Sequence, residues 1–421
     1  MNKSITKMFL ILMGVMMLNC VQVLAQDSKI PGGDQKVPMG VEQRNGKLVF
    51  ESKDGAFQWW FDSRIQFDGA MYFENKNPLS NGTLFRRVTF ATKAVLHKDW
   101  QAELDLEFAE AVLELRDVWI QYTFPEVNLS LRAGNFKEPF GMERLNSSRL
   151  LTFLERSAVS SAFPRGRRVG FAARYWTDNA QITAGIFGHE PGTKIDKGTK
   201  DEGFSSNVRL SYAPINKHGQ NIHIGAAYAY TIPDAVPDLA PNTIEINARA
   251  ESYVFDPKFL HTGDISDVNY YNRFGGEVMG IFGPFYVQGE YQMTKVKRWY
   301  GKEDIDLSGG YGMIAFNLTG ETRYYYADEG EVGPVEKPIN SWGALEVAFR
   351  YSILDLNDLG AGIKGGKSNQ MMFGLNYYPN SNIKIQLNYS RVDMDENATS
   401  KGRLIGDDDF SFIQMRVQAS L

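Results

Sequence analysis

The feature that most constrains the fold is an alternation of apolar and polar side chains with a period of two residues, which recurs in segments of about ten residues. In one segment the even positions are Trp100, Ala102, Leu104, Leu106 and Phe108, and the odd positions are Gln101, Glu103, Asp105 and Glu107. Successive side chains of a β-strand point to opposite faces, so one face of this segment suits lipid and the other suits water. The alternation predicts an all-β chain.

The last residues of the chain repeat this pattern. One face would carry Ile413, Met415, Val417, Ala419 and Leu421, and the other Gln414, Arg416, Gln418 and Ser420. Bacterial outer-membrane barrels commonly close on such a strand, usually with an aromatic residue at the C-terminus. Leu421 departs from that habit, which weakens this one indication without removing it.

The first 25 residues have the pattern of a secretory signal peptide. Two lysines precede an apolar run that is too short to cross a bilayer as a helix, and small residues follow at the spacing that a signal peptidase reads. We predict a signal peptide over 1–25 and a flexible leader over 26–45. Cys20, the single cysteine, would leave with the signal peptide, so the mature chain would have neither a disulfide nor a cysteine metal site.

The rest of the chain, residues 46–421, is predicted to be one transmembrane antiparallel β-barrel of about 16 strands, at about 24 residues for each strand with its connection. A soluble two-sheet sandwich is the alternative, because alternating strands also build sandwiches. Export, an aromatic content of 13% and the lack of any domain boundary argue against it. A barrel of this width holds water rather than a packed core.

One long segment, about 136–168, lacks the alternation and is predicted to fold into the lumen as a constriction loop. Loops of this length are uncommon and usually functional. The segment is too apolar around Leu150-Leu151-Thr152-Phe153-Leu154 to be a solvated loop. Its arginines are Arg144, Arg149, Arg156, Arg165, Arg167 and Arg168.

Together these residues resemble the phosphate-selective porins O and P of Gram-negative outer membranes. The segments that carry the resemblance are Phe85-Arg86-Arg87-Val88-Thr89-Phe90, Leu115-Arg116-Asp117-Val118-Trp119, Gly134-Asn135-Phe136-Lys137-Glu138-Pro139-Phe140-Gly141 and Phe153-Leu154-Glu155-Arg156-Ser157. The resemblance implies a 16-stranded barrel, usually trimeric, whose third outer loop enters the lumen. It also implies arginines and lysines that lead anions to a constriction, although the positions of that ladder cannot be assigned one by one.

The alternation places a set of basic residues in the lumen, where guanidinium groups could replace part of the hydration shell of phosphate. Together with the loop arginines Arg144, Arg149, Arg156, Arg165, Arg167 and Arg168, the candidate anion-binding residues are Arg87, Lys93, Arg132, Arg174 and Arg209. Arg350, Lys384 and Arg416 are assigned to the lumen by the same rule. So are the acids Glu103, Asp105, Glu107, Glu290 and Glu346, which could pair with the arginines and leave a general diffusion pore.

The function predicted is passive diffusion of small hydrophilic solutes across a Gram-negative outer membrane, with a preference for anions such as phosphate. The partners would be inorganic anions, outer-membrane lipid and two further copies of the chain in a homotrimer; the mildly acidic composition does not suggest nucleic acid. The five scattered histidines match neither a catalytic motif nor a metal site, so no enzyme, metal or cofactor is expected. A third possibility is a surface-binding barrel, which the aromatic residues Tyr253 and Phe255 of a long outer loop would serve.

Overall fold

A computed structural model describes residues 39–44, 47–191, 201–234, 242–255 and 257–420. The predicted signal peptide over 1–25 lies outside these residues and stays a prediction. None of the helices in the described ranges is long and apolar enough to cross a bilayer.

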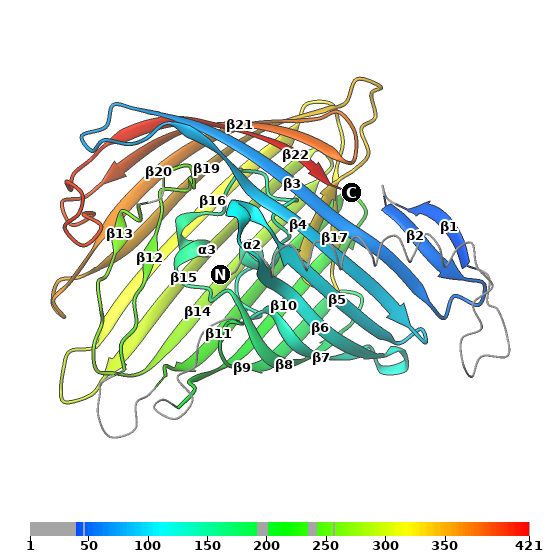
Figure 1. Cartoon of the computed structure of the whole chain (residues 1–421), viewed down its shortest axis with the longest axis horizontal. Helices are drawn as coiled ribbons and strands as arrows, with labels where there is room; N and C mark the ends of the chain where they lie inside the picture. The colour runs from blue at the N-terminus through cyan, green and yellow to red at the C-terminus, as the bar shows by residue number, and fades with distance from the viewer. Residues whose placement is uncertain (1–38, 45–46, 192–200, 235–241, 256, 421) are drawn as a thin grey trace.

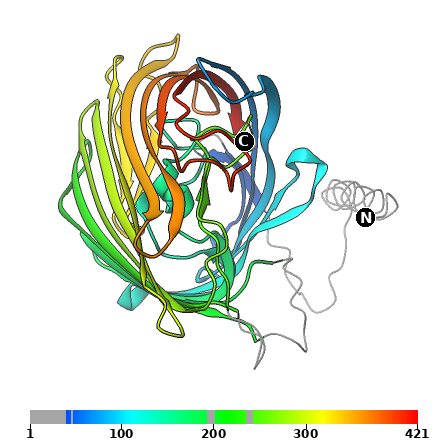
Figure 2. The same ribbon diagram turned by 90° about the vertical axis from the view of Figure 1, so that its left-hand side faces the viewer.

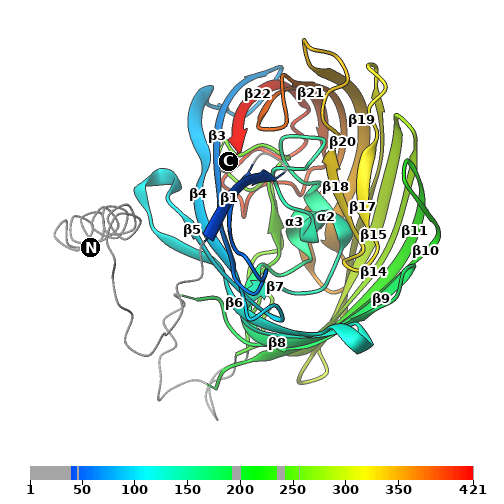
Figure 3. The same cartoon turned by 90° about the vertical axis from the view of Figure 1, so that its right-hand side faces the viewer.

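Sixteen antiparallel strands form a closed barrel, as predicted (Figures 1, 2 and 3). Each strand pairs with the next along the chain, and the last pairs with the first through Ser411–Ser420 against Phe73–Arg64. The strands are β3 (Gln58–Phe73), β4 (Gly82–Leu96), β5 (Trp100–Glu107), β6 (Glu114–Phe124), β7 (Leu129–Lys137), β8 (Arg167–Trp176), β9 (Ala180–Phe187), β10 (Phe204–Lys217), β11 (Gln220–Ile232), β14 (Val268–Phe282), β15 (Phe285–Arg298), β16 (Ile305–Asn317), β19 (Ala344–Asp358), β20 (Ile363–Tyr378), β21 (Ile383–Met394) and β22 (Phe410–Ser420).

Burial runs opposite to that of a soluble protein, because apolar side chains lie on the outer wall and polar ones face inward. In β22 the apolar Met415 is 46% exposed, whereas the neighbouring Arg416 is 0% exposed. In β8 Val169 and Phe171 are exposed and Ala172 is buried. An outer wall of this kind needs hydrocarbon around it. The facing rule is therefore confirmed for these strands.

Two β-bulges break the alternation near β4 and β6 and turn extra polar side chains inward. Gln66 of β3 pairs with Arg87 and the next residue pairs with Phe85, which leaves Arg86 as the extra residue. A second irregularity lies between Leu104 and Leu106 of β5, which pair with Val118 and Leu115 of β6. Bulges re-aim side chains in this way. Leu106 keeps its predicted lipid-facing direction, because it pairs with Phe90 while its neighbour Asp105 lines the lumen, although its side chain is buried.

The N-terminal part differs from the prediction at residues 39–57. Strand β1 (Met39–Arg44) pairs with β2 (Lys47–Ser52), so the last residues of the predicted leader over 26–45 form a hairpin. Strand β2 in turn pairs with the start of β3, through Val49–Glu51 against Trp60–Gln58. The hairpin has backbone partners along the edge of the sheet, which a composition-based prediction of flexibility could not anticipate. The barrel itself begins at Gln58 rather than at residue 46.

The connections fall into two classes, one at each end of the barrel. Short turns such as 125–128, 218–219 and 283–284 lie at the end that also carries the C-terminus, whereas long loops lie at the opposite end. Outer-membrane barrels place the short turns in the periplasm. One connection breaks this division: residues 318–343, at the turn end, contain the hairpin formed by β17 (Arg323–Tyr326) and β18 (Glu331–Val335).

Candidate functional site

Residues 138–166, between β7 and β8, lie inside the barrel, and we call them the inner loop (Figure 3). The loop contains two short helices, α2 (Met142–Leu145) and α3 (Ala158–Ala162). The carbonyl oxygen of Thr152 accepts a hydrogen bond of 2.8 Å from Asn376 of β20, and that of Leu151 accepts one from Lys384 of β21. The loop therefore spans the lumen from β7 and β8 to the opposite wall.

Glu155 anchors the middle of the inner loop to the barrel wall. Its carboxylate accepts hydrogen bonds of 2.8 Å from Arg86 of β4 and 2.6 Å from Arg416 of β22, and Arg87 lies 3.5 Å away. Burial alone would raise the pKa of Glu155, but the three arginines, Arg86 first, hold it well below its ordinary value. The loop is thus fixed by a carboxylate that remains ionised.

Glu143 connects the two helices of the inner loop to each other and to β19. One carboxylate oxygen accepts hydrogen bonds from the backbone nitrogen and the hydroxyl group of Ser157, at 3.0 and 2.8 Å. The other lies 3.2 Å from Arg350. Because Ser157 is the N-cap of α3, this contact sets the position of the helix as well as its start.

A second segment belongs to the loop over 233–267 and enters the lumen from the loop end with its described residues 242–255. Glu251 accepts hydrogen bonds from the backbone of Ala158, at 2.9 Å, and from Ser352 of β19, at 2.7 Å. The ring of Tyr253 lies 3.5 Å from the guanidinium carbon of Arg86. The aromatic residues that could have served surface binding are therefore directed into the barrel, because the acid beside them pairs with the inner loop and the wall.

The hairpin 318–343 reaches the inner loop from the turn end. The backbone nitrogen of Val332 donates to the side-chain oxygen of Asn146 at 3.2 Å. Arg323 donates to the Thr152 hydroxyl group at 3.1 Å and pairs with Glu346 of β19. The predicted lumen assignments of Glu346 and Arg350 agree with these contacts. The hairpin itself was not predicted, because its sequence resembles that of an ordinary connection.

A cavity of about 790 Å³ remains along β3–β8. Its basic lining residues are Arg64, Arg86, Arg87, Lys93, Arg116, Arg132, Lys137, Arg144, Arg149, Arg156 and Arg167, and its acidic ones are Asp62, Glu103, Asp105, Glu114, Asp117, Glu155, Glu329 and Glu331. Eleven basic groups therefore face eight acidic groups across one cavity, which is large enough for many water molecules. The formal excess of three positive charges favours an anion in the cavity.

Seven of the eleven candidate residues line this cavity and four do not. The seven are Arg87, Lys93, Arg132, Arg144, Arg149, Arg156 and Arg167. The other four are engaged elsewhere: Arg165 lies 3.4 Å from Glu138, Arg168 lies 3.0 Å from Glu190, Arg174 lies 3.3 Å from Glu329, and Arg209 lies 2.6 Å from Glu277. The loop arginines are thus divided between the cavity and its surroundings.

Sequence reasoning missed four basic residues of the cavity. Arg86 and Arg116 were not predicted to face the lumen because each lies at a bulge, where the period of two fails. Arg64 alternates with the exposed Ile65 in β3, so its inward direction could have been read from the pattern. Lys137 is the last residue of β7, where the strand gives way to the inner loop, and the alternation does not extend to such a position.

The cavity cations form two groups according to their partners. Some pair with carboxylates: Lys93 lies 3.1 Å from Glu103, Arg149 lies 3.1 Å from Asp62, and Arg167 lies 2.5 Å from Asp117. Within the described ranges, five have no carboxylate oxygen within 4 Å, and these are Arg64, Arg132, Lys137, Arg144 and Arg156. We call these five residues the open cations. Their charges are available to a mobile anion.

The open cations around α2 are held by backbone carbonyls. Arg156 donates to the carbonyl oxygens of Glu143 at 2.7 Å and Asn146 at 2.6 Å, and Lys137 donates to the same Asn146 oxygen at 3.2 Å. Burial, followed by repulsion from Arg144, lowers the pKa of Arg156 to about 10. Cations that crowd and repel each other bind an added anion favourably, because the anion relieves the repulsion.

Arg132 is held by aromatic and amide groups instead of acids. Its guanidinium carbon lies 4.1 Å from the ring centre of Trp119, and its Nε donates to Gln121 at 2.9 Å. Stacking on a ring orients a guanidinium group without neutralising it. The remaining donors of Arg132 can therefore bind an anion.

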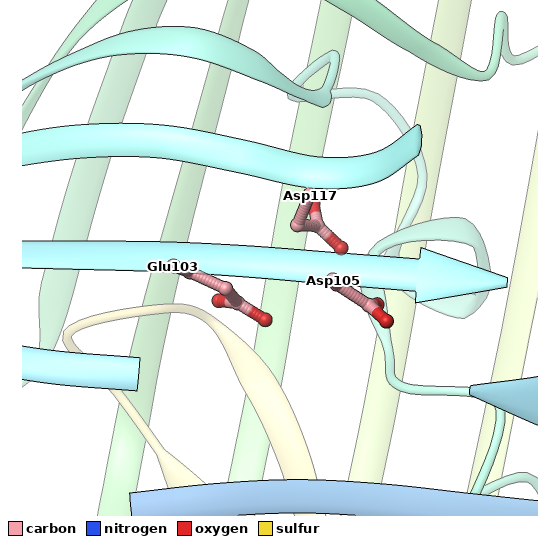
Figure 4. A group of neighbouring side chains, drawn as sticks. All are labelled: Glu103, Asp105 and Asp117. Atoms are coloured by element: carbon pink, nitrogen blue, oxygen red, sulfur yellow. The ribbon is translucent and has the colours of Figure 1, made fainter. Parts of the chain in front are cut away.

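Three acids of the cavity, Glu103, Asp105 and Asp117, converge so that one oxygen from each lies within 4.8 Å of the others (Figure 4). Such a set could hold a metal ion in principle. Each acid, however, has a basic partner: Lys93 for Glu103, Arg116 for Asp105 at 3.5 Å, and Arg167 for Asp117. The three positive charges already balance the three negative ones, so this geometry gives a bound cation little advantage.

Comparisons with known proteins agree with the barrel fold and identify the family. A family model described as phosphate-selective porin O and P matches residues 60–420. Porin O of Pseudomonas aeruginosa is 25% identical over 408 residues, which cover 87% of this chain and 90% of that protein. A protein of Caulobacter vibrioides is 26% identical over 384 residues, covering 88% of this chain and 75% of that one.

Solved structures share the fold at low sequence identity. The anion-selective porin from Comamonas acidovorans superposes with a TM-score of 0.53 at 13% identity, over 87% of this chain and 100% of that one. The trimer form of OmpT from Vibrio cholerae gives 0.55 at 8% identity, over 87% and 100%. The family match covers most of the barrel, so this chain belongs to the phosphate-selective porin O and P family and is a channel of the Gram-negative outer membrane.

Proposed function

We propose that this porin selects anions, and that phosphate and related oxyanions bind in the cavity beside the inner loop on their way across the membrane. The observation that supports this most strongly is the group of open cations, three of which (Lys137, Arg144 and Arg156) lie on or directly before the inner loop. Guanidinium groups bind phosphate oxygens through paired donors and stay ionised at neutral pH. The description of the family as phosphate-selective and the anion selectivity of the Comamonas porin point the same way.

The cavity would bind anions with moderate affinity, as a channel requires. The open cations lie among eight carboxylates, which reduce the positive potential and leave several weak sites rather than one deep one. An ion must leave the site as readily as it enters for current to flow. An unselective diffusion pore is the alternative, and the same eight carboxylates favour it.

The test is the current through single channels in planar bilayers under a KCl gradient, with and without inorganic phosphate. We expect a reversal potential close to the chloride equilibrium potential, and we expect phosphate to block the current. Arg144→Gln removes an open cation for which the described residues provide no hydrogen-bond acceptor. Loss of one charge-assisted hydrogen bond of about 1.5–3 kcal/mol should raise the half-blocking phosphate concentration about tenfold or more.

The matched control is Arg391→Gln, which removes the same charge from β21 outside the cavity, where Arg391 pairs with Glu74 at 2.9 Å. The control should leave both the reversal potential and the block unchanged. Weakly selective currents that phosphate does not affect would overturn the proposal and support a general diffusion pore.

We also propose that the chain forms a homotrimer in the outer membrane. Support comes from the trimer form of the Vibrio porin, which shares the fold. The test is the mass of the detergent-solubilised protein by light scattering, before and after heating. A monomer mass under mild extraction would contradict the proposal.

A further inference from the structure

The tip of the hairpin 318–343 carries acids into the cationic cavity. The tip comprises Asp328-Glu329-Gly330, which precede β18, and Glu331, the first residue of β18. Glu329 and Glu331 both line the cavity, although the hairpin belongs to the opposite end of the barrel from the long loops. They supply two of its eight acids. Without them the formal excess of positive charge in the lining would rise from three to five.

The backbone of this tip accepts hydrogen bonds from an arginine of the barrel wall. Arg209 donates to the carbonyl oxygens of Glu329 at 3.0 Å and Gly330 at 2.7 Å. Gly330 has a φ of +63°, and a Cβ atom there would lie 2.5 Å from the Ser211 hydroxyl oxygen. Only glycine combines this backbone conformation with so close an approach. The position of the tip is therefore built into the fold.

The two carboxylates face the cavity cations without being neutralised by them. Glu329 makes one ion pair, with Arg174 at 3.3 Å, and its side chain is 42% exposed. The carboxylate of Glu331 has neither a hydrogen bond nor an ion pair within the described ranges. Burial, and then the charge of Glu329, raise the pKa of Glu331 to about 7. Negative charge at this place is therefore costly.

We propose that Glu329 and Glu331 are specificity-determining residues, acting as tethered anions that compete with permeating oxyanions for the cations of the cavity. They lower the affinity of the cavity, and they discriminate most strongly against multiply charged anions because repulsion grows with charge. The hairpin thus sets how firmly an anion is held before it leaves toward the turn end. This inference rests on the proposed anion pathway.

The experiment compares the wild-type channel with Glu329→Gln/Glu331→Gln at pH 8, where Glu331 is ionised, in the same bilayers and the same KCl gradient, with inorganic phosphate as the probe. The reversal potential should shift toward the chloride equilibrium potential. The half-blocking phosphate concentration should fall about threefold to tenfold, as expected for two partly solvated charges. Glu329→Asp/Glu331→Asp keeps both charges and should retain wild-type values.

The matched control is Glu336→Gln, a change of the same charge on the same hairpin. Glu336 lies at its base, 3.1 Å from His218, and does not line the cavity. Glu329→Gln alone is a milder variant, since it removes one of the two charges, and it should shift the potential in the same direction by a smaller amount. Heat-dependent migration in gels confirms that each variant is a folded barrel.

The outcomes separate this inference from the proposed function. A wild-type channel that selects anions and is blocked by phosphate, with no shift in the folded double variant, would overturn the inference and leave the function standing. A wild-type channel without selectivity would overturn the function. Even then the double variant must move the reversal potential toward chloride, because the shift measures the charge of the tip and not the starting selectivity.

Discussion

The two sides of the lumen are built from the same alternating strands, yet they treat buried charge in opposite ways. Beside β10–β22 the lumen is packed, and arginines such as Arg350 and Arg416 are fully buried with two carboxylate partners each. Beside β3–β8 the lumen is open, and five cations have no carboxylate partner in the described ranges. The difference teaches that an inward arginine is structural or functional according to what enters the lumen opposite it.

The largest effect should come from breaking the packed side at Arg350. This residue pairs with Glu143 of the inner loop and Glu251 of the loop over 233–267. Arg350→Gln leaves two carboxylates buried without a cation, which should lower the free energy of unfolding by about 3–5 kcal/mol. Urea unfolding in detergent micelles measures it. Wild-type stability in this variant would mean that water reaches the two carboxylates. The packed and open sides of the lumen would then not differ in how they treat buried charge.

An intermediate effect should follow acidification, through Glu155 at the border between the two sides. Since its pKa in the folded state is below the ordinary 4.5, the stability that it contributes is complete above pH 4.5 and is lost as the pH falls through the folded pKa. A pKa that is lower by one in the folded state corresponds to about 1.4 kcal/mol of free energy of unfolding. Unfolding experiments between pH 6 and the acid range should show a shallower decline for Glu155→Gln than for the wild type. Equal slopes would assign the acid sensitivity to other carboxylates.

The smallest effect should come from an ion pair of the open side. Lys93 and Glu103 lie 3.1 Å apart, with side chains that are 27% and 11% exposed. Because water reaches this pair, Lys93→Met should change the free energy of unfolding by no more than about 1 kcal/mol. The same urea titration compares it directly with Arg350→Gln. A loss as large as that of Arg350→Gln would remove the distinction between the two sides.

Much of the barrel could be predicted from residue patterns. The alternation in β22 and β8 identified the lipid face correctly, because lipid outside and water inside impose the period of two on every regular strand. The period of two failed locally at Arg86 and Arg116, where bulges add a residue to the strand.

The site was predictable only in part. The inner loop was recognised because a long segment without alternation interrupts the strands. Seven of the eleven candidate anion-binding residues line the cavity. The roles of Arg165 and Arg209 were not predictable, since their partners Glu138 and Glu277 are far from them along the chain. The acidic tip of the hairpin was missed for the same reason.

By itself, the sequence determined the class of fold, the lipid-facing and lumen-facing sides of the regular strands, and the segment that would enter the lumen. These properties depend on local periodicity, which the bilayer enforces strand by strand. Only the tertiary structure decided which lumen arginines are paired and which remain open. That depends on three segments, the inner loop, the loop over 233–267 and the hairpin 318–343, which meet in space from both ends of the barrel. Ion pairing is a matter of a few ångströms between residues distant in the chain, and periodicity carries no information about it.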